Sequence, residues 1–429
     1  MQYETRRHGL KTRDDYIELC KKRGLGSEMQ KIYPEFDIDY DRYENLLSKL
    51  PENKETWIVS APGRTELAGN HTDHNNGRVL AASVSLDTVA AVQKRGDNTV
   101  LLISEGYPVD FIVDLNSLEP LDEEKNTTLG LIRGIAGGLK ERGYSIGGFQ
   151  AYVHSNVPPG SGLSSSASIE ILLGSIFSHI YNDGRIPPVV LAQTGQFAEN
   201  RYFGKPSGLM DQLACAVGGV ICIDFENSEN PVIESADADF SGYSLMIVNT
   251  GGSHADLTPQ YASIPKEMSR VAGLFGRSVC RGISFNELLL KYNEIRKISG
   301  DRAFLRVLHY LNENRRVTAM FNALRRKDMK EYLATANESG NSSFKYLQNC
   351  YSPENTAEQG IPVALALTET YLKDRSFACR VHGGGFAGTI QVYVPEELSE
   401  EYITSMESTF GKDSVCMLAI RDTGAYCFE

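Results

Sequence analysis

The segment 157–168, VPPGSGLSSSAS, contains residue types suited to holding a phosphate group. Gly160 and Gly162 permit positive φ angles and let the backbone come close to a ligand, and the serines add hydroxyl donors. The following residues predict a helix over 165–180, whose first N–H groups lack partners within the helix and lie at the positive end of its dipole. Because no Gly-Lys-Ser/Thr follows, the segment is not a Walker A loop. It indicates anion binding at a helix start, although a flexible turn with a serine helix cap has the same composition.

Three other segments also concentrate groups that bind or react. The first segment, residues 64–76, contains seven polar side chains, more than the solvation of a loop requires: Arg64, Glu66, Asn70, His71, Asp73, His74 and Asn75. In the segment 199–212, Asp211 follows a glycine turn and has apolar neighbours, which is typical of a helix N-cap or of a general base. The segment 380–388, RVHGGGFAG, precedes a predicted strand and has the composition of a tight turn. Within it, we expect His382 to be a structural or solvated residue rather than a catalyst.

The elements that must hold these segments alternate between strands and helices. Apolar runs predict strands at 57–60, 79–92, 100–103, 108–113, 148–153, 244–248 and 389–394. Helices are predicted within the first 50 residues, at 129–142 and at 165–180, with a helix-rich region at 265–347. The polar stretch 63–77 is predicted to be a loop. This alternation indicates an α/β (α+β) fold, and we expect two domains, at residues 1–235 and 236–429.

Composition limits the class of protein. The 429 residues suffice for two or three domains, and 43 Lys and Arg against 55 Asp and Glu give a net charge of −12. Such an acidic chain repels nucleic acid and anionic membranes unless it carries a basic patch, and the sequence has none. No stretch approaches the roughly 20 apolar residues of a membrane helix, and no signal peptide is evident. We therefore expect a cytoplasmic protein without a nucleic-acid or membrane partner, whose eight scattered cysteines are reduced.

In chain order, the four segments resemble the motifs of the GHMP kinase family, and most closely those of its galactokinase branch. Residues 62–77, PGRTELAGNHTDHNNG, are similar to the sugar-binding signature PGRxNLIGEHTDYNxG. Residues 162–168 match the phosphate loop GLSSSAS, and residues 204–212, GKPSGLMDQ, resemble GxxCGIMDQ. Residues 383–388, GGGFAG, resemble GGGFGG. The resemblance extends over roughly residues 57–394 and is specific in both order and spacing.

The resemblance implies a two-domain GHMP kinase fold with the active site in the cleft between the domains. It also implies ATP and Mg²⁺, with phosphorylation of the anomeric hydroxyl of a sugar, and thus conversion of galactose to α-galactose 1-phosphate. Asp211 matches the catalytic carboxylate and Arg64 the arginine beside it, while Ser166 and Glu199 match the Mg²⁺ ligands. The matched sugar-contacting positions are Asn70, His71, Asp73, Gly208 and Tyr261. The matched ATP-binding loop comprises Gly160, Ser161, Gly162, Leu163, Ser164, Ser165, Ser166 and Ala167.

The chemistry of these residues suits such roles. An anomeric hydroxyl is a weak nucleophile, so a carboxylate that accepts its proton assists the reaction. Phosphoryl transfer depends on holding the reactants in line and neutralising charge on the phosphoryl oxygens, and Arg64 can supply that charge. If Arg64 lies close to Asp211, it also favours the ionised carboxylate and makes it a weaker base. Mg²⁺ prefers hard oxygen ligands and retains several waters, so one hydroxyl and one carboxylate are sufficient. We expect a monomer or a weak oligomer.

Three departures from the galactokinase pattern bear on the substrate and the nucleotide. Asn70 stands where galactokinases usually have Glu facing the sixth carbon of the sugar, and His74 replaces a Tyr. Thr128 and Leu131 stand where relatives often have a Trp and a Tyr near the nucleotide. Because an amide does not repel a sugar acid and the histidines attract one, galacturonate is an alternative to galactose. N-acetylgalactosamine and L-arabinose are further alternatives.

Two other functions are compatible with parts of this pattern. One is a non-catalytic sugar and ATP sensor, but the intact phosphate loop at 164–167 and the presence of Asp211 argue against it. The other is a GHMP kinase for mevalonate, homoserine or an inositol-like substrate. The cluster from Asn70 to Asp73, which suits a ligand with many hydroxyls, argues against that branch.

Overall fold

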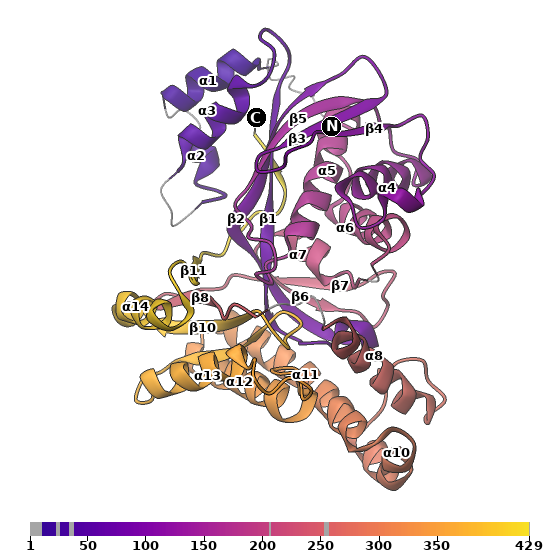
Figure 1. Cartoon of the computed structure of the whole chain (residues 1–429), viewed down its shortest axis with the longest axis vertical. Helices are drawn as coiled ribbons and strands as arrows, with labels where there is room; N and C mark the ends of the chain where they lie inside the picture. The colour runs from indigo at the N-terminus through magenta and orange to yellow at the C-terminus, as the bar shows by residue number, and fades with distance from the viewer. Residues whose placement is uncertain (1–10, 23–25, 34–37, 206, 253–256, 429) are drawn as a thin grey trace, which may run out of the picture.

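Two β-sheets organise the chain, one in the upper and one in the lower half of Figure 1. The figure shows a computed structural model, which describes residues 11–22, 26–33, 38–205, 207–252 and 257–428. Helices cover both faces of each sheet, and the longest strands run from the upper sheet toward the lower one. The predicted mixed α/β class is confirmed.

The upper sheet has eight strands among the described residues, with β12-β1-β2-β5-β3-β4 in spatial order and β6 and β7 attached through β2. Only β3 and β5 pair in parallel; the other pairs are antiparallel. At 17 residues, β2 is long enough to pair with β5 at one end and with β6 at the other. The strands are β1 (Trp57–Ala68), β2 (Arg78–Lys94), β3 (Thr99–Ser104), β4 (Phe111–Asp114), β5 (Phe149–Ser155), β6 (Val220–Asp224), β7 (Val232–Ala236) and β12 (Tyr426–Cys427).

The first strand corrects the prediction of a loop over 63–77. β1 continues to Ala68, so Arg64 and Glu66 are buried strand residues rather than loop residues. Register shifts between Pro62 and Arg64 and between Glu66 and Ala68 allow the strand to stay paired with β2. Polar residues mislead a pattern-based prediction here because their charges have partners inside the protein and therefore tolerate burial.

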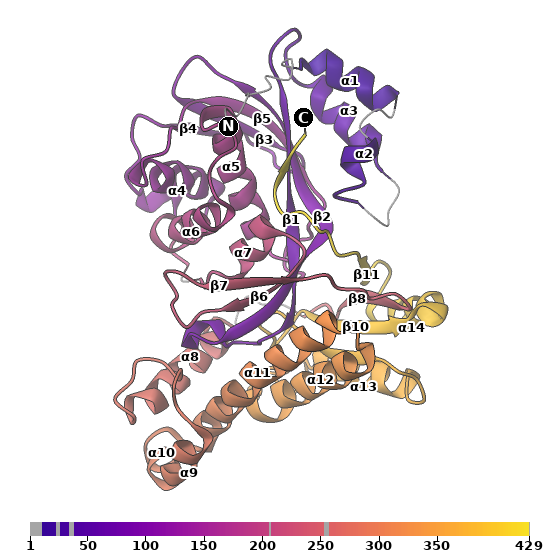
Figure 2. The same ribbon diagram turned by 180° about the vertical axis from the view of Figure 1, so that it is seen from behind.

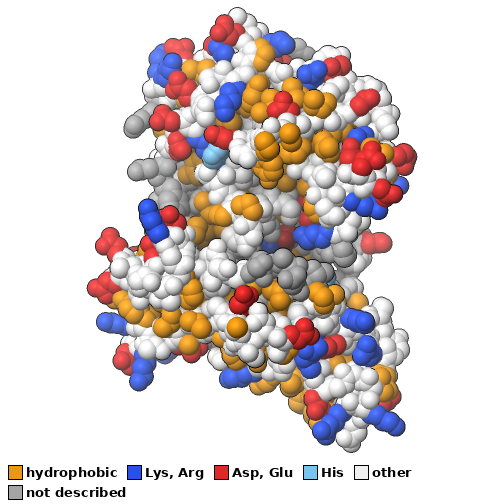
Figure 3. Space-filling view, in the orientation of Figure 1, with side chains coloured by type: hydrophobic (Ala, Val, Ile, Leu, Met, Phe, Trp, Pro, Cys, Tyr) orange, Lys and Arg blue, Asp and Glu red, His pale blue; other side chains and the backbone are white. Residues whose placement is uncertain are grey.

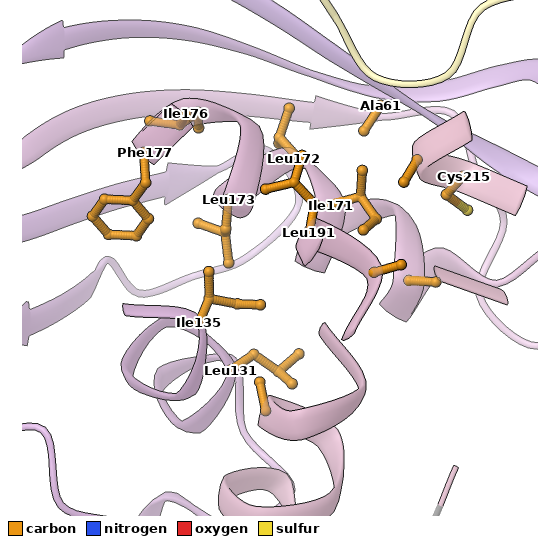
Figure 4. Packing of buried hydrophobic residues seen from close by; sticks show 14 of the residues in the cluster. Ala61, Leu131, Ile135, Ile171, Leu172, Leu173, Ile176, Phe177, Leu191 and Cys215 are labelled. Atoms are coloured by element: carbon orange, nitrogen blue, oxygen red, sulfur yellow. The ribbon is translucent and has the colours of Figure 1, made fainter. Parts of the chain in front are cut away.

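Helices from the first half of the chain pack on one face of the upper sheet. They are α4 (Thr128–Glu141), α5 (Ser165–Tyr181), α6 (Pro188–Ala198) and α7 (Met210–Val217), with a π-helical turn η3 (Glu199–Phe203) after α6. Figure 4 shows their apolar side chains meeting, with Ile135 and Leu131 of α4 facing Leu173 of α5 and Leu191 of α6. Burying apolar surface of this kind contributes about 25 cal/mol per Å².

The opposite face of the upper sheet carries α1 (Arg13–Lys21), α2 (Gly26–Met29) and α3 (Tyr40–Ser48) (Figure 2). A buried ion network joins these helices to the sheet and to the end of the chain. Asp87 of β2 pairs with Arg42 of α3 at 2.7 Å and with Arg421 at 3.3 Å. Tyr33 and Ser60 also donate hydrogen bonds to the carboxylate of Asp87.

The lower sheet is antiparallel, with the order β11-β8-β10-β9. Its strands are β8 (Tyr243–Asn249), β9 (Ala378–His382), β10 (Thr389–Pro395) and β11 (Val415–Leu418). One face packs on α13 (Gly360–Tyr371) and α14 (Ser399–Phe410), and the other on α11 (Asp301–Arg325) and α12 (Met329–Ser342). A further group projects at the bottom of Figure 1: α8 (Thr258–Gly273), α9 (Phe285–Leu290) and α10 (Tyr292–Ser299). Short turns are η1 (Asp73–Asn75), η2 (Asp122–Glu124), η4 (Ser343–Leu347) and η5 (Glu396–Leu398).

The expected boundary between residues 235 and 236 falls within β7, the last strand of the upper sheet before the chain passes to β8 of the lower sheet. That division stays a prediction, and β12 returns from the C-terminal part to pair with β1. No helix in the described part of the chain is long and apolar enough to cross a membrane. Basic and acidic side chains are interspersed over the face shown in Figure 3.

Candidate active site

The glycine- and serine-rich segment forms a loop that leads into α5. Gly160 and Gly162 have φ angles of +73° and +75°, as the sequence suggested, and Ser164, which immediately precedes α5, has a φ of +58°. The side chain of Ser164 does not cap the helix, so the N–H groups of the first turn remain available to an anion. This geometry is that of an anion-binding loop at a helix N-terminus, in a helix of 17 residues.

Arg64 joins this loop to the predicted catalytic carboxylate. Its Nε and Nη2 lie 2.7 Å from the two oxygens of Asp211, a bidentate pair. Its Nη1 donates to the carbonyl of Gly162, and its backbone N–H donates to Leu163 at 3.0 Å. Ser164 in turn donates to Asp211 at 2.5 Å. The two halves of the predicted chemistry, the phosphate loop and the carboxylate, are therefore in direct contact.

Asp211 lies in the first turn of α7, and its side chain is one-third exposed, at 33%. It does not cap the helix, because its carboxylate points to Arg64 and Ser164. Burial alone raises the pKa of Asp211, but the Arg64 guanidinium and the Ser164 hydroxyl outweigh it and hold this pKa below its usual value. The carboxylate is therefore ionised at neutral pH and reaches into the site from its own helix.

Glu199, a predicted metal ligand, starts the π-helical turn η3 and is 3% exposed. Lys205 lies 3.2 Å from its Oε1, and Gln212 donates to its Oε2, also at 3.2 Å. Gln212 donates as well to Glu170 of α5, which follows the other predicted ligand, Ser166, by one helical turn. Glu199 and Ser166 thus lie on the same side of α5.

The signature segment after β1 is held from below by one helix. Along α11, His309 donates to the carbonyl of Asn70 at 3.0 Å, and Tyr310 donates to that of Asn75 at 2.9 Å. Glu313 accepts from the backbone N–H of Gly69 at 3.1 Å, and Asn314 accepts from that of Arg78 at 2.6 Å. Burial lowers the pKa of His309, so the neutral ring both donates to Asn70 and accepts from Ser342.

Three of the predicted sugar-contacting residues donate hydrogen bonds to the second glycine cluster, at residues 383–388. Asn70 donates to the carbonyl of Gly383 at 2.7 Å, and His71 donates to that of Gly384 at 2.9 Å. The hydroxyl of Tyr261, on α8, donates to the carbonyl of Gly385 at 2.7 Å. Three consecutive carbonyls of one loop therefore bring together residues that are far apart in the sequence.

Asn70 is 1% exposed and has its polar atoms engaged by protein groups. Its amide also donates to Glu66 at 3.1 Å, and its carbonyl accepts from Asn349 at 2.7 Å. Glu66 pairs with Arg380 of β9 at 2.7 Å, and both are buried. Asn70 therefore supports the glycine cluster, and a direct contact with the sixth carbon of a sugar requires one of these bonds to be exchanged.

Asp73 and Gly208 meet on the other side of the signature segment. A Cβ atom at Gly208 would overlap the carboxylate of Asp73, so only glycine permits this close approach. His74 lies 3.6 Å from the same carboxylate. A cavity of about 810 Å³ borders Asp73 and Gly208, and its other walls include Gln193, Gln196 and Phe197 of α6. Asp211 follows Gly208 by three residues, so the predicted sugar-contacting residues and the predicted catalytic carboxylate are close together in the chain.

His382 lies directly beneath the phosphate loop. It is 2% exposed and hydrogen-bonds to Thr65 and Thr389, each at 3.0 Å. Burial lowers the pKa of His382 to about 3, so the ring is neutral. A Cβ on Gly162 would come within 2.7 Å of the His382 ring. The histidine is a structural support for the loop, as expected, and it connects β9 with the loop before α5.

Several other residues named from the sequence lie elsewhere or were overlooked. Thr128 begins α4, and Leu131 is buried in the core. His154 accepts a hydrogen bond from Arg42, away from the loop, and His254 lies outside the described residues. Sequence reasoning missed Lys205, Gln212 and Asn349, although Lys205 and Gln212 fall within the motif at 204–212. A check for charged or amide neighbours in that motif would have found those two, whereas Asn349 has no motif signal.

Family models match two parts of the chain. The GHMP kinases N terminal domain matches residues 130–219, and the galactokinase galactose-binding signature matches residues 48–94. A galactokinase from Clostridium tetani is 32% identical over 278 residues, which cover 63% of this chain and 69% of that protein.

Solved structures share the fold. Lactococcus lactis galactokinase complexed with galactose superposes with a TM-score of 0.76 and 24% identity, covering 90% of this chain and 98% of that one. Methanococcus jannaschii mevalonate kinase gives a TM-score of 0.59 at 16% identity, covering 85% of this chain and 98% of that one. Both are similar over nearly their whole length, with the galactokinase structure clearly the better match of the two.

Proposed function

The chain belongs to the galactokinase branch of the GHMP kinases and is a sugar kinase, and from this premise we propose that it transfers the γ-phosphoryl group of ATP to the anomeric hydroxyl of galactose. One observation carries the proposal: the Asp211 carboxylate is bound by Arg64 and by Ser164 of the phosphate loop. An acceptor carboxylate and a phosphate site in contact are what transfer to a hydroxyl requires. The product is α-galactose 1-phosphate.

In this proposal Asp211 orients the anomeric hydroxyl and accepts its proton, while Arg64 neutralises charge on the transferred group. The ion pair with Arg64 makes Asp211 a weak base before the reaction. During transfer, the Arg64 guanidinium also interacts with the negative charge on the phosphoryl oxygens. This interaction weakens its ion pair with the Asp211 carboxylate. We therefore propose that proton transfer accompanies, rather than precedes, movement of the phosphoryl group.

The donors present fit Mg²⁺ bound with ATP. Ser166 and Glu199 offer one hydroxyl and one carboxylate, both hard oxygen ligands, on the same side of α5. Mg²⁺ retains several waters, so these two protein ligands suffice together with water and the nucleotide phosphates. When bound, the ion would neutralise charge on the phosphates.

Galactose is favoured over a sugar acid by the charges around the signature segment. Burial lowers the pKa of His71 to about 4, so this ring carries no positive charge at neutral pH and does not attract a carboxylate. Glu66 is buried beside Asn70 and is paired with Arg380. This ion pair does not attract the carboxylate of a sugar acid. Asp73, which approaches Gly208, and Tyr261, which hydrogen-bonds to Gly385, suit the hydroxyls of a galacto-configured ring.

A substrate comparison with the purified full-length protein tests the proposal. ADP release is measured with MgATP and galactose, galacturonate, N-acetylgalactosamine or L-arabinose. We expect the highest kcat/KM with galactose, together with a dependence on the metal. Failure of every one of these sugars to be phosphorylated would contradict the proposal and favour a sensor that binds without turnover.

The variant Asp211→Asn separates catalysis from binding. Because the amide cannot accept the proton but has a similar shape, kcat with galactose should fall about 10³-fold. ADP binding, measured by calorimetry, should change little. The exposed Asp374→Asn serves as the matched control and should retain wild-type kcat. A kcat for Asp211→Asn within a few-fold of the wild-type value would exclude Asp211 as the base.

A further inference from the structure

The carboxylate of Glu199 has no free oxygen in this structure. Oε1 pairs with the Lys205 ammonium at 3.2 Å, and Oε2 accepts from the Gln212 amide at 3.2 Å. A divalent cation that binds either oxygen therefore competes with the partner already there. The two differ in how firmly they are held.

Gln212 is the fixed partner. It is 1% exposed, and the same amide nitrogen donates to Glu170 at 3.0 Å. Glu170 is fully buried, and burial raises the pKa of its carboxyl group well above the usual value. Moving Gln212 would leave polar groups unpaired in the interior, at a cost of about 1–3 kcal/mol.

Lys205 is the mobile partner. Its side chain is 56% exposed and extends from the turn that ends η3, where Gly204 has a φ of +87°. A lysine ammonium on a flexible stem can return to water without leaving a buried group unpaired. Of the two partners of Glu199, we therefore expect Lys205 to be the one that a cation displaces.

Charge explains why a cation is needed at this position. Glu199 is 3% exposed; of the acids near it, Asp211 already has Arg64 as its partner and Glu170 shares the Gln212 amide. Without Lys205, Glu199 would be a buried carboxylate without a cation, facing the place where nucleotide phosphates bind. Such a group is strongly destabilising and repels an anionic ligand.

We propose that Lys205 is a positioning residue that occupies the metal-binding oxygen of Glu199 and yields it to Mg²⁺ when the metal nucleotide binds. The proposal rests on the function proposed above, in which Glu199 is a metal ligand. Lys205 keeps the site neutral and orients the carboxylate in the metal-free protein. Once the divalent ion has taken its place, the ammonium is not required for nucleotide binding.

Calorimetry of ADP binding, with excess Mg²⁺ and with a chelator, tests this on the full-length protein. In Lys205→Met, ADP affinity without metal should fall about 10-fold, because Glu199 then repels the phosphates without compensation. With Mg²⁺, the affinity should stay within about 3-fold of the wild-type value. Lys205→Arg keeps the charge and should behave as the wild type under both conditions. The exposed Lys373→Met removes one positive charge elsewhere and should change neither affinity.

Two results would overturn the proposal. Equal loss of affinity with and without Mg²⁺ would mean that Lys205 contacts the nucleotide itself, and no loss in either condition would mean that its pairing with Glu199 has no role. Failure of the function proposed above is distinguishable, because the wild-type protein would then release no ADP from MgATP with any of the four sugars, whereas the binding comparison of Lys205→Met requires no turnover.

Discussion

Glu66 on β1 and Asn70 in the turn after it are hydrogen-bonded to each other, and Glu66 pairs with the buried Arg380. In the signature PGRxNLIGEHTDYNxG these two positions carry Asn and Glu, the reverse of this chain. One acid and one amide thus occupy these two positions in both patterns, in exchanged order. Burial raises the pKa of Glu66, while Arg380 acts against it and keeps a cation beside the carboxylate.

Exchanging the two residues tests this view. Glu66→Asn removes the carboxylate that pairs with the buried Arg380, which should reduce the free energy of unfolding by about 3–5 kcal/mol. Asn70→Glu places a second carboxylate beside Glu66 and should also destabilise. The double variant restores one acid and one amide, so its loss should be at least ~2 kcal/mol smaller than the sum of the single losses. Urea unfolding measures all four proteins, and strict additivity would show that the residues act independently.

At the scale of residues, the sequence predicts a contact where the chemistry of a motif requires a particular residue type. Arg64 and Asp211 could be predicted because a kinase needs a cation and a carboxylate at motif positions, and the structure brings them within 2.7 Å. The pairing of Glu66 with Arg380 could not, because it joins residues 314 positions apart that lie on strands of different sheets. Nothing local in either segment specifies that contact.

At the scale of elements, the loop before α5 depends on a strand from the other sheet. His382 of β9 supports Gly162 from below, and Thr389 of β10 donates to the carbonyl of Ser161 at 3.2 Å. The phosphate loop could be predicted from its glycines and from the helix that follows it. Its support could not be predicted, because a histidine beside a glycine turn has no signal that distinguishes a support from a solvated side chain.

Two glycines of this loop offer a matched pair of substitutions. Both Gly160 and Gly162 have positive φ, so alanine strains the backbone by about 1 kcal/mol at either position. A Cβ on Gly160 meets nothing within 4 Å, whereas one on Gly162 comes within 2.7 Å of His382. We expect Gly162→Ala to weaken MgADP binding at least about 10-fold and Gly160→Ala to weaken it by less than about 5-fold. Equal effects in calorimetry would show that His382 gives the loop no support.

At the scale of the whole molecule, α11 connects the lower part of the chain to the signature segment after β1. Four of its residues hold the backbone of residues 69–78, and none of them belongs to a recognisable motif. Alternating strands and helices predicted the class of fold, since apolar periodicity is a local property. They could not predict that a helix more than 200 residues later would hold the turn after β1, because such packing depends on the assembled sheets.

Glu313 of α11 makes this connection sensitive to acid. It is fully buried, accepts from the Gly69 backbone and from Ser339, and pairs with Arg316 at 2.7 Å. Burial alone would raise the pKa of Glu313, but Arg316, His309 and Arg380 outweigh it and lower the pKa to about 2. In the unfolded chain a glutamate has a pKa of about 4.3, so the folded state binds the proton more weakly.

The free energy of unfolding should therefore include a contribution from Glu313 that is complete above about pH 5 and disappears as the pH falls toward about 2. Glu313→Gln removes this contribution, so the variant should be less stable than the wild type at neutral pH by ~3 kcal/mol, with a gap that narrows in acid. Urea unfolding between about pH 7 and about pH 3 measures the gap, and the exposed Glu397→Gln is the matched control. Because the ionised carboxylate also holds the turn at Gly69, the KM for galactose should rise in Glu313→Gln. A gap that stays constant with pH would mean that Glu313 stabilises the fold through its shape and hydrogen bonds, without its charge.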